Sequence, residues 1–261
     1  MARSVLITGG AHRLGSMLCR CFAKAGWDVW CHYQRSSSAA ELLRYELEQQ
    51  GFSIRTIQAD LADDAQRRQM MNHIMVQSGP LYCLVNNASS FEPDSARDFD
   101  IDAARQQLEV NLLAPMALSA LMAQGIPCSD TSGGRSIIHV LDQKVFNLNP
   151  DYFSYTTSKL ALERLVALQA QALSPQLRVC GVAPGLMFLS GPQTQQNFDK
   201  ASRINLMRRP TSPAQVAASC LFLADNQCIT GVTLTVDNGQ HLVPLPRDVM
   251  FMVQDLLKDS Q

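Results

Sequence analysis

The feature that most constrains the fold of this chain is a repeated alternation of two sequence patterns. Short apolar runs rich in β-branched residues alternate with longer stretches whose apolar residues recur at helical spacing. Since two parallel strands need a crossover connection, strands that alternate with helices favour parallel βαβ units. The predicted strands cover residues 3–8, 27–33, 54–59, 81–86, 135–141, 177–182 and 232–236. The predicted helices lie near residues 13–25, 38–50, 63–78, 102–124, 153–174 and 212–224.

The apolar runs also indicate that both faces of the sheet are covered. The run 135–141, for example, is apolar from residue 137 to residue 141 except for His139, as expected for a buried parallel strand. We therefore predict an α/β fold with a single domain over residues 1–261. Its core is a doubly wound (Rossmann-type) parallel sheet of about seven strands flanked by helices, and ligands are expected at the carboxyl ends of the strands.

Two segments depart from the alternation. Residues 186–210 contain Gly191, a Gln/Asn-rich stretch and an Arg-Arg-Pro sequence, which predicts a substrate loop or short helices over the site. Residues from about 246 to 258 carry Val249, Met250 and Val253 at helical spacing. This pattern predicts a C-terminal tail helix that either docks on its own core or contacts another subunit.

Composition and charge exclude several classes of protein. The 261 residues have a net charge of -1, with 46% hydrophobic and 17% charged residues, which favours neither nucleic acid nor an anionic membrane as a partner. No apolar run approaches the roughly 18 residues needed to span a bilayer, and we expect no secretory signal. The cysteines and histidines are not clustered, so no metal site is predicted. The expectation is a cytoplasmic protein.

A glycine-bearing turn stands at the first strand–helix junction. It reads Thr8-Gly-Gly-Ala-His-Arg-Leu-Gly15, and its glycines let the backbone turn tightly and approach a pyrophosphate at the helix N-terminus. The spacing is not G-x-G-x-x-G, so a turn without a ligand is the alternative. Its place at the first junction of a doubly wound pattern favours a dinucleotide site. The candidate contacts in this turn are Gly9, Arg13, Leu14 and Gly15.

The end of the second strand indicates which dinucleotide binds. NAD sites usually place an acid there to hold the ribose 2′-hydroxyl, whereas a 2′-phosphate needs positive charge and donors. The run here is His-Tyr-Gln-Arg-Ser over residues 32–36, with no acid before Glu41. An arginine beside hydroxyl groups suits a phosphate, although a solvated Arg35 is the alternative. The predicted cofactor is NADPH/NADP+, with Tyr33, Arg35, Ser36 and Arg13 as candidate contacts.

Tyr155 and Lys159 are four residues apart and therefore lie on one face of a predicted helix. A free tyrosine, with a pKa near ~10, is a poor acid or base at neutral pH, and a nearby ammonium stabilises its phenolate. Such a pair can pass a proton to a substrate while a nicotinamide passes a hydride. Without further motifs, the same spacing would describe an ordinary surface pair.

Further motifs appear in a fixed order along the chain. They are Asp60-Leu61, Asn86-Asn87-Ala88, Asn111, Tyr155-Thr-Thr-Ser-Lys159, Pro184-Gly185 and Val236-Asp237-Asn238-Gly239. Together with the Thr8–Gly15 turn, they resemble the short-chain dehydrogenase/reductase family over about residues 4–239. The resemblance implies that Lys159 also holds the nicotinamide ribose, that Asn111 keeps a proton-relay water in place, and that the protein is a homo-oligomer (a tetramer, or a dimer). It also implies cofactor contacts from Asp60, Leu61, Asn87, Ala88, Ser89, Tyr155, Lys159, Pro184 and Gly185.

The end of the fifth strand departs from that family. Most members place a serine there, whereas this chain has Asp142. An ionised carboxylate cannot donate a hydrogen bond, and it would repel the alkoxide formed from a ketone. Asp142 is better suited to a substrate that gains a proton on nitrogen, either as an acid of raised pKa or as an anion beside a cationic imine. The alternatives are an inactive site or an aspartate that caps local backbone.

Four features together resemble the pteridine reductase branch, which includes trypanosomatid pteridine reductases and bacterial dihydromonapterin reductases. They are Arg13-Leu14-Gly15, the run 32–36, Ser89-Ser90-Phe91 and Asp142. The resemblance implies a pterin between Phe91 and the nicotinamide, with substrate contacts from Arg13, Ser89, Phe91, Asp142 and Tyr155. The reaction would convert a 7,8-dihydropterin or dihydrofolate to its tetrahydro form.

One residue does not match that branch. It has a serine two residues after Pro-Gly, where this chain has Met187. The alternative functions are an NADPH-dependent carbonyl or 3-oxoacyl-type reductase, and a catalytically silent NADP(H)-binding sensor.

Overall fold

A seven-stranded parallel sheet forms the centre of the molecule. The computed structural model describes residues 3–127, 129–130, 132–191 and 193–258. The strands are β1 (Ser4–Ile7), β2 (Asp28–Tyr33), β3 (Ile54–Gln58), β4 (Cys83–Asn86), β5 (Arg135–Val140), β6 (Leu177–Pro184) and β7 (Thr233–Val236). They lie in the order β3-β2-β1-β4-β5-β6-β7, and every neighbouring pair is parallel. The predicted α/β fold with a Rossmann-type sheet is confirmed.

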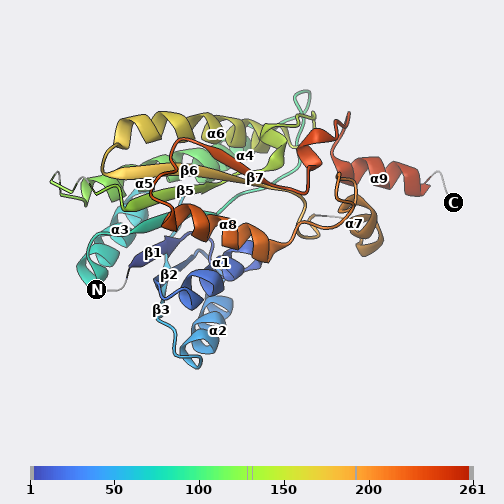
Figure 1. The fold of residues 1–261 in the computed structure, drawn as a ribbon. Helices are drawn as coiled ribbons and strands as arrows, with labels where there is room; N and C mark the ends of the chain where they lie inside the picture. Colours follow the sequence, from blue (N-terminus) through green and yellow to red (C-terminus); the bar gives the residue numbers. More distant parts are fainter. Residues whose placement is uncertain (1–2, 128, 131, 192, 259–261) are drawn as a thin grey trace.

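Helices cover both faces of this sheet (Figure 1). On one face lie α1 (Arg13–Lys24), α2 (Ser37–Glu48) and α8 (Pro213–Asp225), and they share one hydrophobic core with the sheet. On the other face lie α3 (Asp64–Ser78), α5 (Ala114–Gln124) and α6 (Phe153–Leu173), which share a second core. The sheet therefore separates two cores, and α4 (Ile101–Leu108) packs beside α6.

The strand sequences explain this two-sided packing. Successive side chains of a strand point to opposite faces, and in β1 Val5 and Ile7 belong to the core under α1 whereas Leu6 belongs to the core under α5. The same alternation holds in β5, where Ile138 faces the first core and Ile137 the second. Because both faces are apolar environments, the strands read as continuous apolar runs.

Two predicted elements differ in detail from the structure. The predicted helix 102–124 consists of α4, a π-helical turn (Glu109–Leu113) and α5. Such turns insert an extra residue into the helix and often occur at functional sites; here the turn holds the fully buried Asn111. The tail helix α9 (Val249–Lys258) begins three residues later than predicted, because the Asp248 carboxylate accepts a hydrogen bond from the Met250 backbone N–H and caps the helix start.

Helices α7 (Gln195–Ala201) and α9 stand side by side beyond the end of the sheet (Figure 1). Ala201 of α7 packs with Val249 and Val253 of α9, so the tail helix docks on the segment that follows β6. Across the residues that the structure describes, no helix is both long and apolar enough to cross a lipid bilayer.

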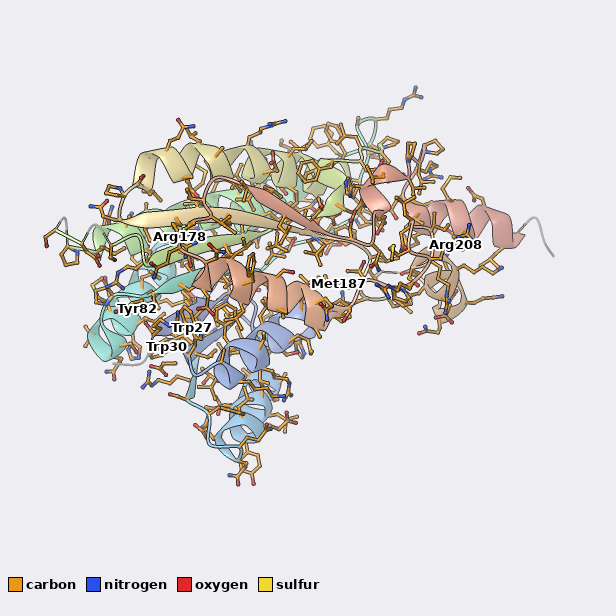
Figure 2. All side chains as sticks on the ribbon, in the orientation of Figure 1. Trp27, Trp30, Tyr82, Arg178, Met187 and Arg208 are labelled. Atoms are coloured by element: carbon orange, nitrogen blue, oxygen red, sulfur yellow. The ribbon has the colours of Figure 1, made fainter. Side chains whose placement is uncertain are left out.

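A buried guanidinium group joins β6 to the C-terminal end of α8. Arg178 is only 5% exposed, and it donates hydrogen bonds to the carbonyl oxygens of Leu223 (2.8 Å), Ala224 (2.8 Å), Ile229 (3.0 Å) and Gly133 (3.0 Å). Helix C-termini leave carbonyl groups without intrahelical partners, and a cation there also interacts favourably with the helix dipole. Figure 2 shows Arg178 at the end of the sheet opposite to Met187.

We expect Arg178→Met to lower the free energy of unfolding by about 3 kcal/mol, because several buried carbonyl groups lose a charged donor. Urea unfolding at neutral pH measures this loss. Arg164→Met is the matched control, since the Arg164 side chain on α6 is 92% exposed and bonds only loosely to Glu163 at 3.5 Å; its effect is expected to stay below about 0.5 kcal/mol. Similar losses in both variants would contradict the structural role of Arg178.

Candidate functional site

A cavity of about 520 Å³ opens at the carboxyl ends of the strands. Most of the site residues predicted from the sequence line it. They are Gly9, Arg13, Leu14, Gly15, Ser36, Asp60, Leu61, Asn87, Ala88, Ser89, Phe91, Asp142, Tyr155, Lys159, Pro184 and Gly185. Of the other three predicted residues, Tyr33 and Arg35 do not line the cavity, and Asn111 lies behind its wall.

The turn after β1 needs glycine for steric reasons. Gly9 has φ +62°, in the left-handed region, and a Cβ on Gly15 would lie 1.9 Å from the Gly9 carbonyl oxygen. The loop therefore packs directly against the start of α1. His12, the N-cap residue of α1, makes no capping hydrogen bond with its side chain, and the first turn carries no acid. A helix start of this kind is suited to an anionic ligand.

Arg13 connects this turn to the predicted substrate loop. Its φ of 47° is also left-handed, a conformation that glycine adopts more readily. The Arg13 guanidinium donates to the Leu189 carbonyl oxygen at 3.3 Å. Through this contact the glycine turn is joined to the 186–190 segment, of which Met187 and Phe188 line the cavity.

The end of β4 is tied to the same turn by four hydrogen bonds. The Thr8 hydroxyl oxygen accepts from the backbone N–H groups of Asn87 (2.9 Å) and Ala88 (3.0 Å). The Asn87 amide donates to the carbonyl oxygens of Thr8 (2.9 Å) and Gly9 (3.2 Å). Asn87 therefore holds the glycine turn in shape and also lines the cavity.

His32 is a cavity residue that the sequence analysis left out. Side chains of β2 alternate between faces, so His32 lines the cavity whereas Tyr33 packs against the core. Just after the strand, Gln34 also lines the cavity and Arg35 is exposed. The His32 Nδ1 accepts from the Gly9 backbone N–H (3.0 Å), and Nε2 lies 3.1 Å from the Ala59 carbonyl oxygen. A neutral ring with its hydrogen on Nε2 satisfies both bonds, and burial lowers the pKa of His32 to about 4.

We expect the protein to lose stability as the pH falls from 7 to 5, by roughly 2 kcal/mol for each of His32 and His139. Burial lowers the pKa of both rings to about 4, while an unfolded histidine titrates near ~6.5. The unfolded chain therefore binds protons first, so the stability is complete above about pH 6.5 and is lost towards pH 4. Urea unfolding at both pH values measures the loss. The matched variant His139→Gln should show a loss smaller by roughly 2 kcal/mol, and an unchanged loss would contradict this account.

Asp142, Tyr155 and Lys159 lie close together on the wall of the cavity. The Tyr155 hydroxyl donates to Asp142 Oδ2 at 2.9 Å, and Lys159 Nζ donates to the Val140 carbonyl oxygen at 2.8 Å. Lys159 Nζ also lies 5.7 Å from the centre of the Tyr155 ring. α6 thus places both side chains against the end of β5, four residues apart on one helical face.

Burial is the main cause of the pKa shifts of these groups. It raises the pKa of Asp142 and, together with the negative charge of Asp142, raises the pKa of Tyr155 well above its ordinary value. Burial lowers the pKa of Lys159 to about 8. The Tyr155–Lys159 spacing predicted that Lys159 stabilises the Tyr155 phenolate, but the surroundings of Tyr155 favour its protonated hydroxyl. The structure therefore holds two protonatable groups in direct contact.

Asn111 acts here through other residues. Its Oδ1 accepts from the Ser90 backbone N–H (2.8 Å) and the Ser89 hydroxyl (3.2 Å), and its Nδ2 donates to the Ser90 carbonyl (2.8 Å) and the Ser158 hydroxyl (3.1 Å). These bonds use both donors and both acceptor positions of the amide. The side-chain amide is therefore fully engaged within the protein, and it fixes the 89–90 segment to α6.

A second cavity, of about 190 Å³, adjoins the first beside Asp142 and Tyr155. Three aromatic rings pack together in its wall. The Phe91 ring stacks on Tyr152 (4.1 Å between ring centres) and meets Tyr155 edge-on (4.6 Å). Met187 lines both cavities, just past the carboxyl ends of the strands (Figure 2). A thioether therefore stands in the wall where the pteridine reductase branch has a hydroxyl.

Sequence reasoning missed several other cavity residues. Of residues 32, 34 and 36, which all line the cavity, only Ser36 was selected, and β2 ends at Tyr33 before the last two of them. No strand period marks the loop residues. The cavity residues that were not predicted are His12, His32, Gln34, Val110, Val140, Leu141, Met187 and Phe188.

Comparison with known proteins agrees with this geometry. Pteridine reductase 1 of Leishmania tarentolae is 30% identical over 279 residues, covering 91% of this chain and 96% of that protein. Dihydromonapterin reductase of Enterobacter sp. is 25% identical over 240 residues, covering 92% and 97%. Among solved structures, FolM alternative dihydrofolate reductase 1 from Brucella canis, complexed with NADP, superposes with a TM-score of 0.87. It is 32% identical, covering 92% of this chain and 94% of that one.

The family model described as short chain dehydrogenase matches residues 3–200, which hold the glycine turn, the Tyr155–Lys159 pair and Asp142. The match covers most of the chain, and the sheet order and the cavity at its carboxyl edge agree with it. This chain therefore belongs to the short-chain dehydrogenase family of oxidoreductases.

Proposed function

We propose that the protein is an NADPH-dependent reductase of a pterin-like heterocycle, converting a 7,8-dihydropterin or dihydrofolate to its tetrahydro form. The observation that carries this proposal is the hydrogen bond between the Tyr155 hydroxyl and Asp142 Oδ2. A carboxyl group of raised pKa in this place supplies a proton to a ring nitrogen. In its ionised form the same group suits a ketone poorly, because a carboxylate would repel the developing alkoxide.

The cofactor part of the proposal rests on the larger cavity. NADPH, when bound, supplies the hydride. Gly9 and the uncapped start of α1 would hold the pyrophosphate, since the close-packed glycine turn lets the backbone approach it. Lys159 would hold the nicotinamide ribose. Ser36 lines the cavity at the end of β2, and Arg35, exposed beside it, remains available for a 2′-phosphate.

The substrate part of the proposal rests on the wall shared by the two cavities. Phe91 presents an aromatic surface there, and flat heterocycles stack on such rings. Tyr152 backs the Phe91 ring, which keeps that ring in one orientation. Arg13 lines both cavities and is placed to contact both the cofactor and the substrate. Asp142 and Tyr155 then hold protons beside the same space.

The direct test mixes the purified protein with NADPH and 7,8-dihydrobiopterin, dihydromonapterin or dihydrofolate, and follows the loss of NADPH absorbance. We expect turnover of at least one dihydropterin, with NADPH preferred over NADH. A simple diketone is the comparison substrate. Diketone reduction without pterin turnover would support a carbonyl reductase instead. Tight NADPH binding without turnover of any substrate would support a sensor.

A further inference from the structure

A buried cation lies directly behind the proposed proton donors. The Lys144 side chain is 3% exposed, and it follows Asp142 by two residues in the short 3-10 helix η2 (Gln143–Val145). Its ammonium group donates to Asn149 Oδ1 (2.8 Å), the Asp151 carbonyl oxygen (3.0 Å) and Asp248 Oδ2 (3.1 Å). An ammonium group has three donors. Lys144 is therefore fully engaged within the protein.

The counter-charge of Lys144 comes from a distant part of the chain. Asp248 immediately precedes α9 and is separated from Lys144 by 104 positions. Its backbone N–H donates to Asp151 Oδ2 at 2.7 Å, and its Oδ1 accepts from the Met250 backbone N–H at 3.1 Å. Asp248 thus joins the start of the tail helix to Asp151 and to the helix's own Met250. The C-terminal segment delivers one negative charge to the edge of the site, where Lys144 and Asp248 both line the second cavity.

Lys144 and Asp248 act on Asp142 in opposite directions. The Lys144 backbone N–H donates to Asp142 Oδ1 at 2.9 Å, and the positive charge of Lys144 lowers the pKa of Asp142. The negative charge of Asp248 raises it. The charged and titratable groups that face Asp142 come from α1, η2, α6 and the segment before α9. They are Arg13, Lys144, Tyr155, Lys159 and Asp248.

We propose that Asp248 is a positioning residue that neutralises Lys144, so that Asp142 keeps a proton beside Tyr155 in the resting enzyme. Asp248 acts through Lys144 and does not take part in the proton transfer itself. This inference deepens the proposed function, because it rests on Asp142 as the proton donor. It assigns the tail segment a task at the site: without its carboxylate, the buried ammonium would favour an ionised Asp142, which cannot donate.

The test measures the titration of Asp142 directly. Aspartate labelled with carbon-13 at its carboxyl carbon is followed by NMR against pH in the full chain, and the Asp142 signal is assigned with Asp142→Asn. We expect Asp248→Asn to lower the pKa of Asp142 by about one unit and Lys144→Met to raise it by about one unit. The double variant K144M/D248N removes both charges, so we expect its Asp142 titration to return close to that of the unchanged protein.

The matched control is Arg247→Gln. It removes an ion pair between the same segment and Asp151 (2.9 Å) whose arginine is 47% exposed, and it leaves Lys144 and Asp248 in place. We expect this control not to move the Asp142 titration. A merely structural role of the ion pair predicts no opposite shifts in the two single variants, and shifts of equal sign or none would overturn the inference.

Activity separates this inference from the proposed function. Relative to the unchanged protein, the fall of kcat/KM at high pH should move down by about one unit in Asp248→Asn and up in Lys144→Met, following the NMR titration. Opposite NMR shifts in a protein that turns over no dihydropterin would support the charge compensation and overturn the proposed substrate. Dihydropterin turnover with an unchanged Asp142 titration would support the proposed function and overturn the charge compensation.

Discussion

Replacing Tyr155 by phenylalanine is expected to lower kcat for dihydropterin reduction by about 10³-fold, in the middle of the range for loss of a proton donor. Phenylalanine keeps the ring that packs edge-on against Phe91 but lacks the hydroxyl that bonds to Asp142. The direct path between this side chain and the carboxyl group is therefore lost. Steady-state kinetics with NADPH and a dihydropterin measure the effect, and tryptophan fluorescence measures NADPH binding.

The binding measurement decides how a loss of activity is interpreted. Since the phenylalanine ring would preserve the cavity wall, the Kd for NADPH is expected to change by no more than about twofold, less than about 0.5 kcal/mol. Tyr45→Phe is the matched control, because Tyr45 lies on α2 with 59% of its surface exposed. It should retain full activity. Equal kcat values for Tyr155→Phe and Tyr45→Phe would show that the Tyr155 hydroxyl takes no part in the reaction.

Replacing Asp142 by asparagine is expected to lower kcat/KM for dihydropterin reduction by about 10²-fold. Asparagine has nearly the same shape, and its Oδ1 can still accept from the Lys144 backbone N–H, which donates to Asp142 Oδ1 in the unchanged protein. It cannot release a proton as a carboxylic acid does. The variant therefore tests the acid function of Asp142 while the local backbone stays in place, and thermal unfolding serves as the check on folding.

Asp142→Ser separates the two reductase hypotheses. A serine restores the hydroxyl that most of the family places at the end of β5, and a hydroxyl can donate to a substrate carbonyl. We expect this variant to lose dihydropterin reduction as Asp142→Asn does, while diketone reduction is retained or increased. Full pterin reduction by the serine variant would show that a carboxyl group is not needed at this position.

Site residues that lie close together in the sequence were easier to predict than those that only the fold brings together. Motifs within one turn or one helix were placed correctly on the cavity wall, as Gly9 and Gly15 show. Tyr33, predicted as a cofactor contact, does not line the cavity. His32 and Gln34 lie on the cavity side of β2, and the Tyr33 ring lies with the core.

The order of strands and helices was determined by the sequence alone, since apolar periodicity acts over neighbouring residues and the parallel sheet follows from alternation. From the sequence alone, the end of β5 and the start of α6 could be expected at the same edge of the sheet, but the hydrogen bond between Tyr155 and Asp142 could not. Only the tertiary structure decided the direction of the pKa shifts of that pair, because burial is their main cause. The same holds for the pairing of Lys144 with Asp248, separated by 104 positions. No pattern among neighbouring residues predicts that the carboxylate of Asp248 pairs with the buried ammonium group of Lys144.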